Sequence, residues 1–173
     1  MTPKAFTIKA AKTFALTITV LLVASTAHAQ EGAGSIVKKV ALDPTTYAPA
    51  LIMRYAARAD WRTSQPLFAL GAGEMNARFT VNGISGGLPI SASAGYHKID
   101  KIALRVALDS AMHNAASHFV EAQLLKAHPD NRKLIKAAGI VERIAVGSTI
   151  AYMQSSRHFK QVGINERMLA GVR

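Results

Sequence analysis

The stretch that decides the fold is Ile99–His128, IDKIALRVALDSAMHNAASHFVEAQLLKAH. Wound as an α-helix, at about 100° per residue, it separates two kinds of side chain onto two sides. The apolar side carries Leu104, Val106, Leu108, Ala111, Met112, Ala115, Phe119 and Ala122. The polar side carries Asp109, Ser110, His113, Asn114, Ser117, His118 and Glu121. The pattern predicts an amphipathic helix whose apolar side faces the core and whose polar side faces solvent.

A second long helix, residues 132–160, follows after His128-Pro129-Asp130-Asn131. The proline ends the first helix, and Asp130 or Asn131 caps the next. A connection this short makes the two helices antiparallel neighbours. The stripe that we expect to be buried carries Leu134, Ala138, Val141, Ala145, Ser148, Tyr152 and Phe159.

The middle of this second helix carries no charge from Ile144 to Met153. Four apolar residues there lie on the face that should be wet: Ile144, Val146, Ile150 and Met153. Either a third helix covers this face, or it contacts a membrane or another subunit. The charged residues on both sides leave a run too short to span a bilayer. We therefore predict a partner or lipid face at these four residues.

An earlier helix is predicted over Tyr47–Leu70, because Asp43-Pro44 is typical of a helix start. Pro66 cannot donate to the carbonyl of Arg62, so we expect a kink or a stop there. Residues 80–98 are rich in Gly and Ser and predict a long loop, either mobile or a binding lid. The predicted fold is all-α with three main helices: a kinked first helix, this loop, and a long antiparallel hairpin.

The N-terminus has the pattern of an export signal. Lys4, Lys9 and Lys12 precede an apolar run over Phe14–Ala24, and Ala27-His28-Ala29 offers small residues for cleavage. We expect a signal peptide over residues 1–29 and a periplasmic or envelope-associated protein. The alternative is an uncleaved membrane anchor, which is less favoured because the apolar run is shorter than the roughly 20 residues that span a bilayer. A flexible linker over 30–42, one helical domain over 43–162 and a tail over 163–173 would follow.

Composition narrows the chemistry. The chain has no cysteine, which excludes disulfides, thiolate metal ligands and cysteine nucleophiles. Its formal net charge is +11, and removing the three leader lysines leaves +8. Such a charge favours an anionic envelope surface or an acidic protein partner. Basic runs interleaved with aromatics are missing from the sequence, so we expect no nucleic acid partner.

Four polar residues, Asp60, Ser64, Glu74 and Asn76, form a candidate cluster around the single tryptophan, Trp61. Asp60 and Glu74 would approach each other if the chain reverses at Gly71–Gly73, which would allow acid and base roles. The structural interpretation is favoured: Asp60 bonds Ser64 or an arginine such as Arg105, and Glu74 with Asn76 satisfies backbone groups. A Gly-x-Ser-x-Gly elbow that would present a serine nucleophile is absent from the sequence.

This region resembles a signature of small uncharacterised bacterial helical proteins, D-x-x-[ST]…G-x-x-E-x-N-P. The matching positions are Asp60, Thr63 or Ser64, Gly71, Glu74 and Asn76, with Ala77 in place of the proline. Many of those proteins are membrane-embedded. The resemblance covers about 17 residues and implies a helical architecture rather than an activity.

Asp109, His113, His118 and Glu121 are candidate metal ligands, because Asp109 with His113, or His118 with Glu121, is spaced to share one helix face. The two pairs point up to half a turn apart, so the four cannot hold one ion. We favour a solvated polar face and expect no metal and no cofactor.

The sequence thus predicts an exported, basic, helical protein that is non-catalytic and associates with the envelope or with a partner. The alternative is a small metal-binding protein or a hydrolase that uses Asp60 and Glu74 with a histidine.

Overall fold

The computed structural model describes residues 30–171, and the predicted signal peptide lies outside them. The fold is all-α: the described part of the chain contains four α-helices and no strand. The α-helices are α2 (Gln30–Leu42), α3 (Ala48–Ala69), α4 (Ala92–Ala127) and α5 (Arg132–Ala170). Short 3₁₀ helices connect them: η1 (Pro44–Thr46), η2 (Ala77–Phe79) and η3 (Pro129–Asn131).

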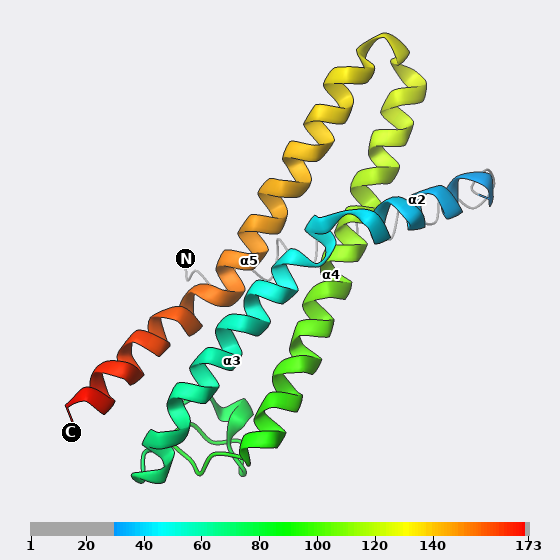
Figure 1. The fold of residues 1–173 in the computed structure, drawn as a ribbon. Helices are drawn as coiled ribbons and strands as arrows, with labels where there is room; N and C mark the ends of the chain where they lie inside the picture. Colours follow the sequence, from blue (N-terminus) through cyan, green and yellow to red (C-terminus); the bar gives the residue numbers. More distant parts are fainter. Residues whose placement is uncertain (1–29, 172–173) are drawn as a thin grey trace, which may run out of the picture.

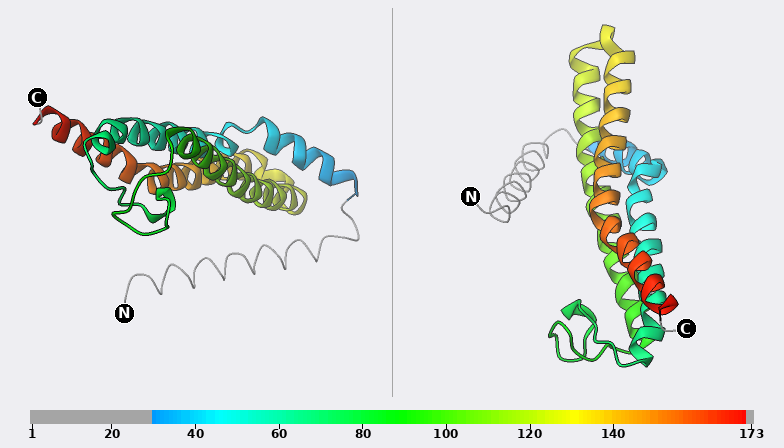
Figure 2. Two further views of the ribbon diagram at one scale, coloured as in Figure 1. Left: turned by 90° about the horizontal axis from the view of Figure 1, so that it is seen from below. Right: turned by 90° about the vertical axis from the view of Figure 1, so that its left-hand side faces the viewer.

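The two longest helices, α4 and α5, run side by side in opposite directions and meet at the turn formed by η3 (Figure 1). Helix α3 runs parallel to α5 and packs along both helices over the half that is far from this turn. Helix α2 crosses α4 near the middle of the hairpin, so the turn end projects beyond both α2 and α3 (Figures 1 and 2).

The hydrophobic core lies at the other end, beneath the loop that joins α3 to α4. Trp61 is buried there, with ring centroids 5.5 Å from Phe68 and 5.3 Å from Phe79. Its indole nitrogen donates to the Ala92 carbonyl at 3.0 Å, which satisfies the polar atom of an otherwise apolar side chain. Ile99 packs in the same cluster. Trp61 therefore fixes the first turn of α4 against α3.

Backbone hydrogen bonds join the first and second halves of the α3–α4 loop, residues 70–91. The Glu74 amide donates to Gly87 at 2.9 Å, and the Ile90 amide donates to Phe79 at 2.8 Å. Gly71, Gly83 and Gly86 have positive φ, the backbone region that glycine tolerates best. The sequence predicts the loop over 80–98, but residues 92–98 already belong to α4. Ser91 caps that helix by accepting from the Ala94 amide.

Several predicted boundaries differ in the structure. Residues 30–42, predicted as a flexible linker, form α2, whose contacts with α4 offset the cost of Gly32 and Gly34 in a helix. The predicted tail over 163–173 continues α5 to Ala170. Pro66 lies inside α3, which runs on to Ala69 without a stop.

The buried face of α4 is the main correction. The sequence predicts that Leu104, Leu108 and Met112 are buried, yet they are 62%, 57% and 57% exposed. The buried positions, spaced three or four residues apart, are Gly95, Ile99, Ala103, Val106, Ser110, Asn114, His118 and Glu121. The half of this face nearest the η3 turn is polar because it packs on η1 and on a buried arginine of α5. The face predicted to be solvated is therefore an interior one.

Candidate functional site

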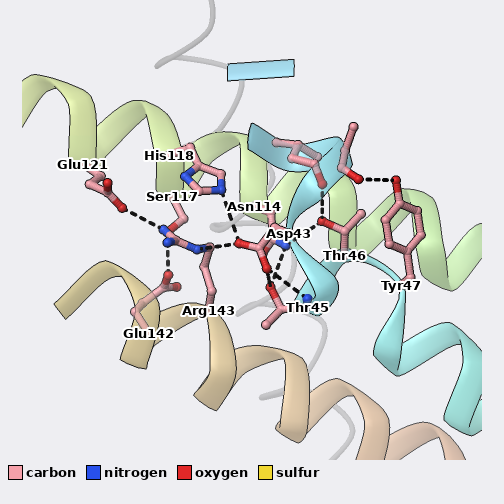
Figure 3. A network of polar contacts seen from close by, with 12 residues as sticks. Asp43, Thr45, Thr46, Tyr47, Asn114, Ser117, His118, Glu121, Glu142 and Arg143 are labelled. Carbon is pink, nitrogen blue, oxygen red and sulfur yellow. Dashed lines mark hydrogen bonds and ion pairs between the residues drawn. The ribbon is translucent and has the colours of Figure 1, made fainter. Parts of the chain in front are cut away.

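A network of buried polar side chains joins η1, α4 and α5 near the middle of the hairpin (Figure 3). Its first member is Asp43, the N-cap of η1, which accepts from the Thr45 amide at 2.9 Å and the Thr45 hydroxyl at 2.6 Å. An acidic cap followed by proline is a favourable start for a short helix. The cap thus holds the Asp43 carboxylate at the α4–α5 interface.

Arg143 of α5 occupies the centre of the network (Figure 3). Its Nε lies 2.9 Å from Asp43 Oδ2, and its Nη1 lies 3.0 Å from Glu121 Oε2. The Arg143 side chain is only 6% exposed, so water screens these charges little. A buried cation between two buried carboxylates compensates their desolvation, and removing one partner would leave an unpaired charge inside the protein.

His118 of α4 lies on the other side of Asp43, with Nε2 3.3 Å from Asp43 Oδ2. Burial lowers the pKa of His118, and the nearby Arg143 charge lowers it further, against the opposing carboxylates of Asp43 and Glu121. Burial alone would raise the pKa of Asp43, but the Thr45 hydrogen bonds and the Arg143 and His118 charges hold it below its usual value. The site thus favours an ionised Asp43 beside a neutral imidazole.

Neighbouring residues extend the network along α4. Asn114 donates at 2.8 Å to the hydroxyls of both Thr45 and Thr46, which anchors η1 on α4. On the α5 side, His113 Nε2 lies 2.8 Å from Glu142 Oε1, and the Ser117 hydroxyl donates to Glu142 Oε2 at 2.7 Å. The α4–α5 contact is therefore largely polar at this level of the hairpin.

Glycines on α5 allow this close approach. A Cβ added to Gly139 would lie 2.6 Å from Glu121 Oε2, and Gly147 packs against Thr45 and Pro49. Gly139, Arg143 and Gly147 are spaced by four, so they share one face of α5. Arg143 is not among the predicted site residues, and this Gly-x₃-Arg-x₃-Gly spacing is the sequence signal that indicates it.

An open cleft of about 430 Å³ adjoins the network. A second hollow of about 240 Å³ shares part of its wall. The walls combine aliphatic side chains with cations and the network itself, and the main cleft is lined by Lys39, Leu42, Asp43, Pro44, Thr45, His118, Ile140, Arg143 and Ile144.

A second polar layer joins α3 to the C-terminal part of α5. Asp60 Oδ2 lies 2.8 Å from His158 Nδ1, and Asp60 Oδ1 accepts from Asn165 at 3.4 Å. The sequence predicts a bond from Asp60 to Ser64 or an arginine. Instead, the Ser64 hydroxyl donates to the Asp60 backbone carbonyl at 2.9 Å, and the carboxylate takes His158 as its partner. Neither His158 nor Asn165 was selected, because nothing local in the sequence links them to a residue about 100 positions earlier.

Glu74 and Asn76 lie in the α3–α4 loop and satisfy backbone groups there, as the structural interpretation predicts. Glu74 Oε1 accepts from the Asn76 amide at 2.6 Å, and Asn76 Oδ1 accepts from the Arg78 amide at 3.2 Å. Burial raises the pKa of Glu74 and the charge of Asp60 adds to this rise, while the hydrogen bond from the Asn76 amide and the charge of His158 oppose it. Of the four predicted cluster residues, the structure brings Asp60 and Ser64 together and leaves Asn76 to local capping.

The structure does not bring the four candidate metal ligands together: three of them have separate partners and the fourth is exposed. Asp109 is exposed, His113 pairs with Glu142, His118 with Asp43, and Glu121 with Arg143. Within residues 30–171, no group of three or more His, Asp or Glu side chains is arranged to hold a metal ion.

The predicted partner or lipid face is partly exposed. Ile144 and Met153 are 52% and 63% exposed, whereas Val146 and Ile150 are half-buried. Ile150 packs against the hydrophobic core. Within the described helices, none is long and apolar enough to cross a membrane.

Comparison of the chain with protein-family models, with curated proteins and with solved structures found no match. The two polar layers are internal and paired, an arrangement suited to fixing helix positions rather than to presenting a nucleophile.

Proposed function

We propose that this chain is an exported, basic, non-catalytic interaction protein that associates with an anionic envelope surface. The proposed functional unit is the arrangement predicted from the sequence, in which a first helix packs on a long antiparallel hairpin. The observation that carries the proposal is the inverted distribution of side chains on α4 and α5. Much of their buried surface is charged or polar, including Asn114, His118 and Arg143, while Leu104, Leu108 and Tyr152 point outward.

Exposed apolar side chains occur on the helices and also in the α3–α4 loop, and those on the helices form stripes. Tyr47, the N-cap of α3, and Leu51 and Tyr55 within α3 recur every four residues and are 45–68% exposed. The Tyr55 ring lies 6.3 Å from that of Phe159, so this stripe continues onto α5. Contiguous apolar surface of this kind marks interaction sites.

Charge supports an anionic surface as the partner. With residues 1–29 removed, the chain retains a net charge of +8, from +11 less three leader lysines. Basic side chains near an anionic bilayer contribute roughly 1 kcal/mol each. The apolar stripes would then add contact area once the protein is held at the surface.

Flotation with lipid vesicles tests this proposal on the protein that starts at Gln30. We expect it to float with vesicles that contain phosphatidylglycerol, and to be released by about 1 M salt as screening shortens the range of the charges. Vesicles of phosphatidylcholine alone are the control. A protein that stays in the soluble fraction with anionic vesicles at low salt would contradict the proposal.

A second candidate function, a hydrolase at Asp60, is favoured by one observation. The Asp60–His158 pair is part-buried, and Glu74 is close enough for its pKa to respond to both residues. Loss of a hydrolytic activity in Asp60→Asn and His158→Gln, with the fold intact, would support it. Unchanged vesicle binding in those variants would separate the two functions.

A further inference from the structure

The cleft beside the polar network has two chemically different parts. Its walls are aliphatic, formed by Leu42 of α2 with Ile140 and Ile144 of α5. Its rim carries Lys39 of α2, and the adjoining hollow carries Lys136 of α5. The two hollows share Lys39, His118, Ile140 and Arg143, so they form one groove.

The cations at this rim are not neutralised within the described residues. Arg143 is taken up by Asp43 and Glu121, but none of the ion pairs between described residues includes Lys39 or Lys136. Lys39 is close enough to the floor for its charge to lower the pKa of His118. An anionic group placed at the rim would therefore meet two available ammonium groups.

A second observation also points to a ligand. His118 lines both hollows, its side chain is 8% exposed, and its Nδ1 has no hydrogen-bond partner among the residues that the structure describes. Buried polar atoms are almost always satisfied by protein, water or ligand. The wall of the groove thus contains a buried, unsatisfied ring nitrogen in addition to the cations at its rim.

We propose that this groove binds one anionic amphiphile, with its phosphate or carboxylate between Lys39 and Lys136 and its apolar chain along Leu42, Ile140 and Ile144. The floor explains why a chain is needed. Asp43 and Glu121 carry two negative charges against the one of Arg143, so a bare phosphate is not drawn deep into the groove. The site is distinct from surface association, because it takes a single molecule with fixed stoichiometry.

Calorimetry on the full-length protein tests the site with dodecyl phosphate below its micelle-forming concentration. We expect one molecule bound per chain. The double substitution Lys39→Ala/Lys136→Ala should weaken binding by about tenfold or more, since each nearby cation contributes roughly a fivefold preference for an anionic group.

The matched control is Lys38→Ala/Lys133→Ala, which removes the same charge from neighbouring positions of α2 and α5 that do not line the groove. This control should bind like the parent. Equal weakening by both double variants would show a net-charge effect and overturn the site.

The two parts of the ligand are separated by two further probes. Inorganic phosphate and dodecyl maltoside should each bind at least about tenfold more weakly than dodecyl phosphate, because each offers only one of the two contacts. Equally tight binding of either probe, or several molecules bound per chain without change in the Lys39/Lys136 variant, would overturn the proposal. Ile140→Ala/Ile144→Ala keeps both lysines and should lose the advantage of dodecyl phosphate over inorganic phosphate.

Discussion

Gly95 of α4 faces the ring of Trp61 on α3. A Cβ there would lie 2.1 Å from the Trp61 ring, inside any allowed contact. Alanine is the better helix former by about 1 kcal/mol, but overpacking a core commonly costs about 1–3 kcal/mol or more. We predict that Gly95→Ala lowers the free energy of unfolding, measured by urea titration of Trp61 fluorescence.

The matched control is Gly163→Ala in α5. An added Cβ at Gly163 meets no atom within 4 Å, so the substitution should stabilise the protein by up to about 1 kcal/mol. Equal changes in the free energy of unfolding for the two substitutions would show that contact with Trp61 does not destabilise Gly95→Ala.

His118 makes stability depend on pH. Burial and the charges of Arg143 and Lys39 lower its folded pKa below the ordinary value of 6.5. The carboxylates of Asp43 and Glu121 oppose this shift. Below about pH 6.5 the unfolded chain therefore binds a proton that the folded chain resists, so the free energy of unfolding falls as the pH falls. The ionised Asp43 adds a separate loss at lower pH, below its ordinary pKa of 3.8.

We predict that the wild-type protein loses stability between pH 7 and 5.5 and that His118→Gln loses less over the same interval. Urea unfolding at the two pH values measures both losses. An identical slope in the two proteins would assign the dependence to another group.

At the scale of an element, the C-terminal part of α5 is held to α3 by Asn165. This side chain is 2% exposed and donates to Ser64 Oγ at 2.9 Å and Thr63 Oγ1 at 3.1 Å. Losing hydrogen bonds from a buried group costs about 1–3 kcal/mol. Asn165→Leu, which keeps the volume similar, should speed amide hydrogen exchange in the last turns of α5.

The exposed neighbour Glu166 supplies the control, since Glu166→Gln should leave exchange unchanged. Slowed or unaltered exchange in Asn165→Leu would mean that apolar packing alone holds this segment.

Element by element, the sequence indicates where helices form more reliably than which side of each is buried. Periodicity placed Ser110, Asn114, His118 and Glu121 together on one face of α4, because residues three and four apart share a face, but it wrongly put Val106 with the exposed Leu104 and Leu108. It could not show that Asn114, His118 and Glu121 find polar partners outside α4. These partners offset the cost of removing the three side chains from water. The capping role of Glu74 and Asn76 was predictable because it is local.

At the scale of the whole molecule, the exposed apolar face of α4 should serve binding and not stability. Leu104→Gln/Leu108→Gln is expected to change the free energy of unfolding by less than about 0.5 kcal/mol per site, since both side chains are more than half exposed. The same variant should float less with anionic vesicles. Val106→Gln, at a 5% exposed position between them, should instead destabilise the fold.

The all-α class could be predicted from the sequence, and the polar contacts between distant segments could not. Asp43 meets Arg143 and Asp60 meets His158 across about 100 residues, and one sequence contains no local signal for such pairs. The helix at 30–42 was missed for a similar reason, since its contacts with α4 are not visible in its own composition.

The two polar layers also fix the position of α5 along its own axis. Arg143 pairs with Asp43 and His158 pairs with Asp60. Sliding α5 by one turn, about 5.4 Å, would therefore leave both carboxylates without their partners. An inserted residue between positions 143 and 158 would break the match, whereas lengthening the η3 turn would leave it intact. These directional contacts thus fix a single position of α5 along α3 and η1. Apolar packing alone would tolerate several positions, because it is not directional.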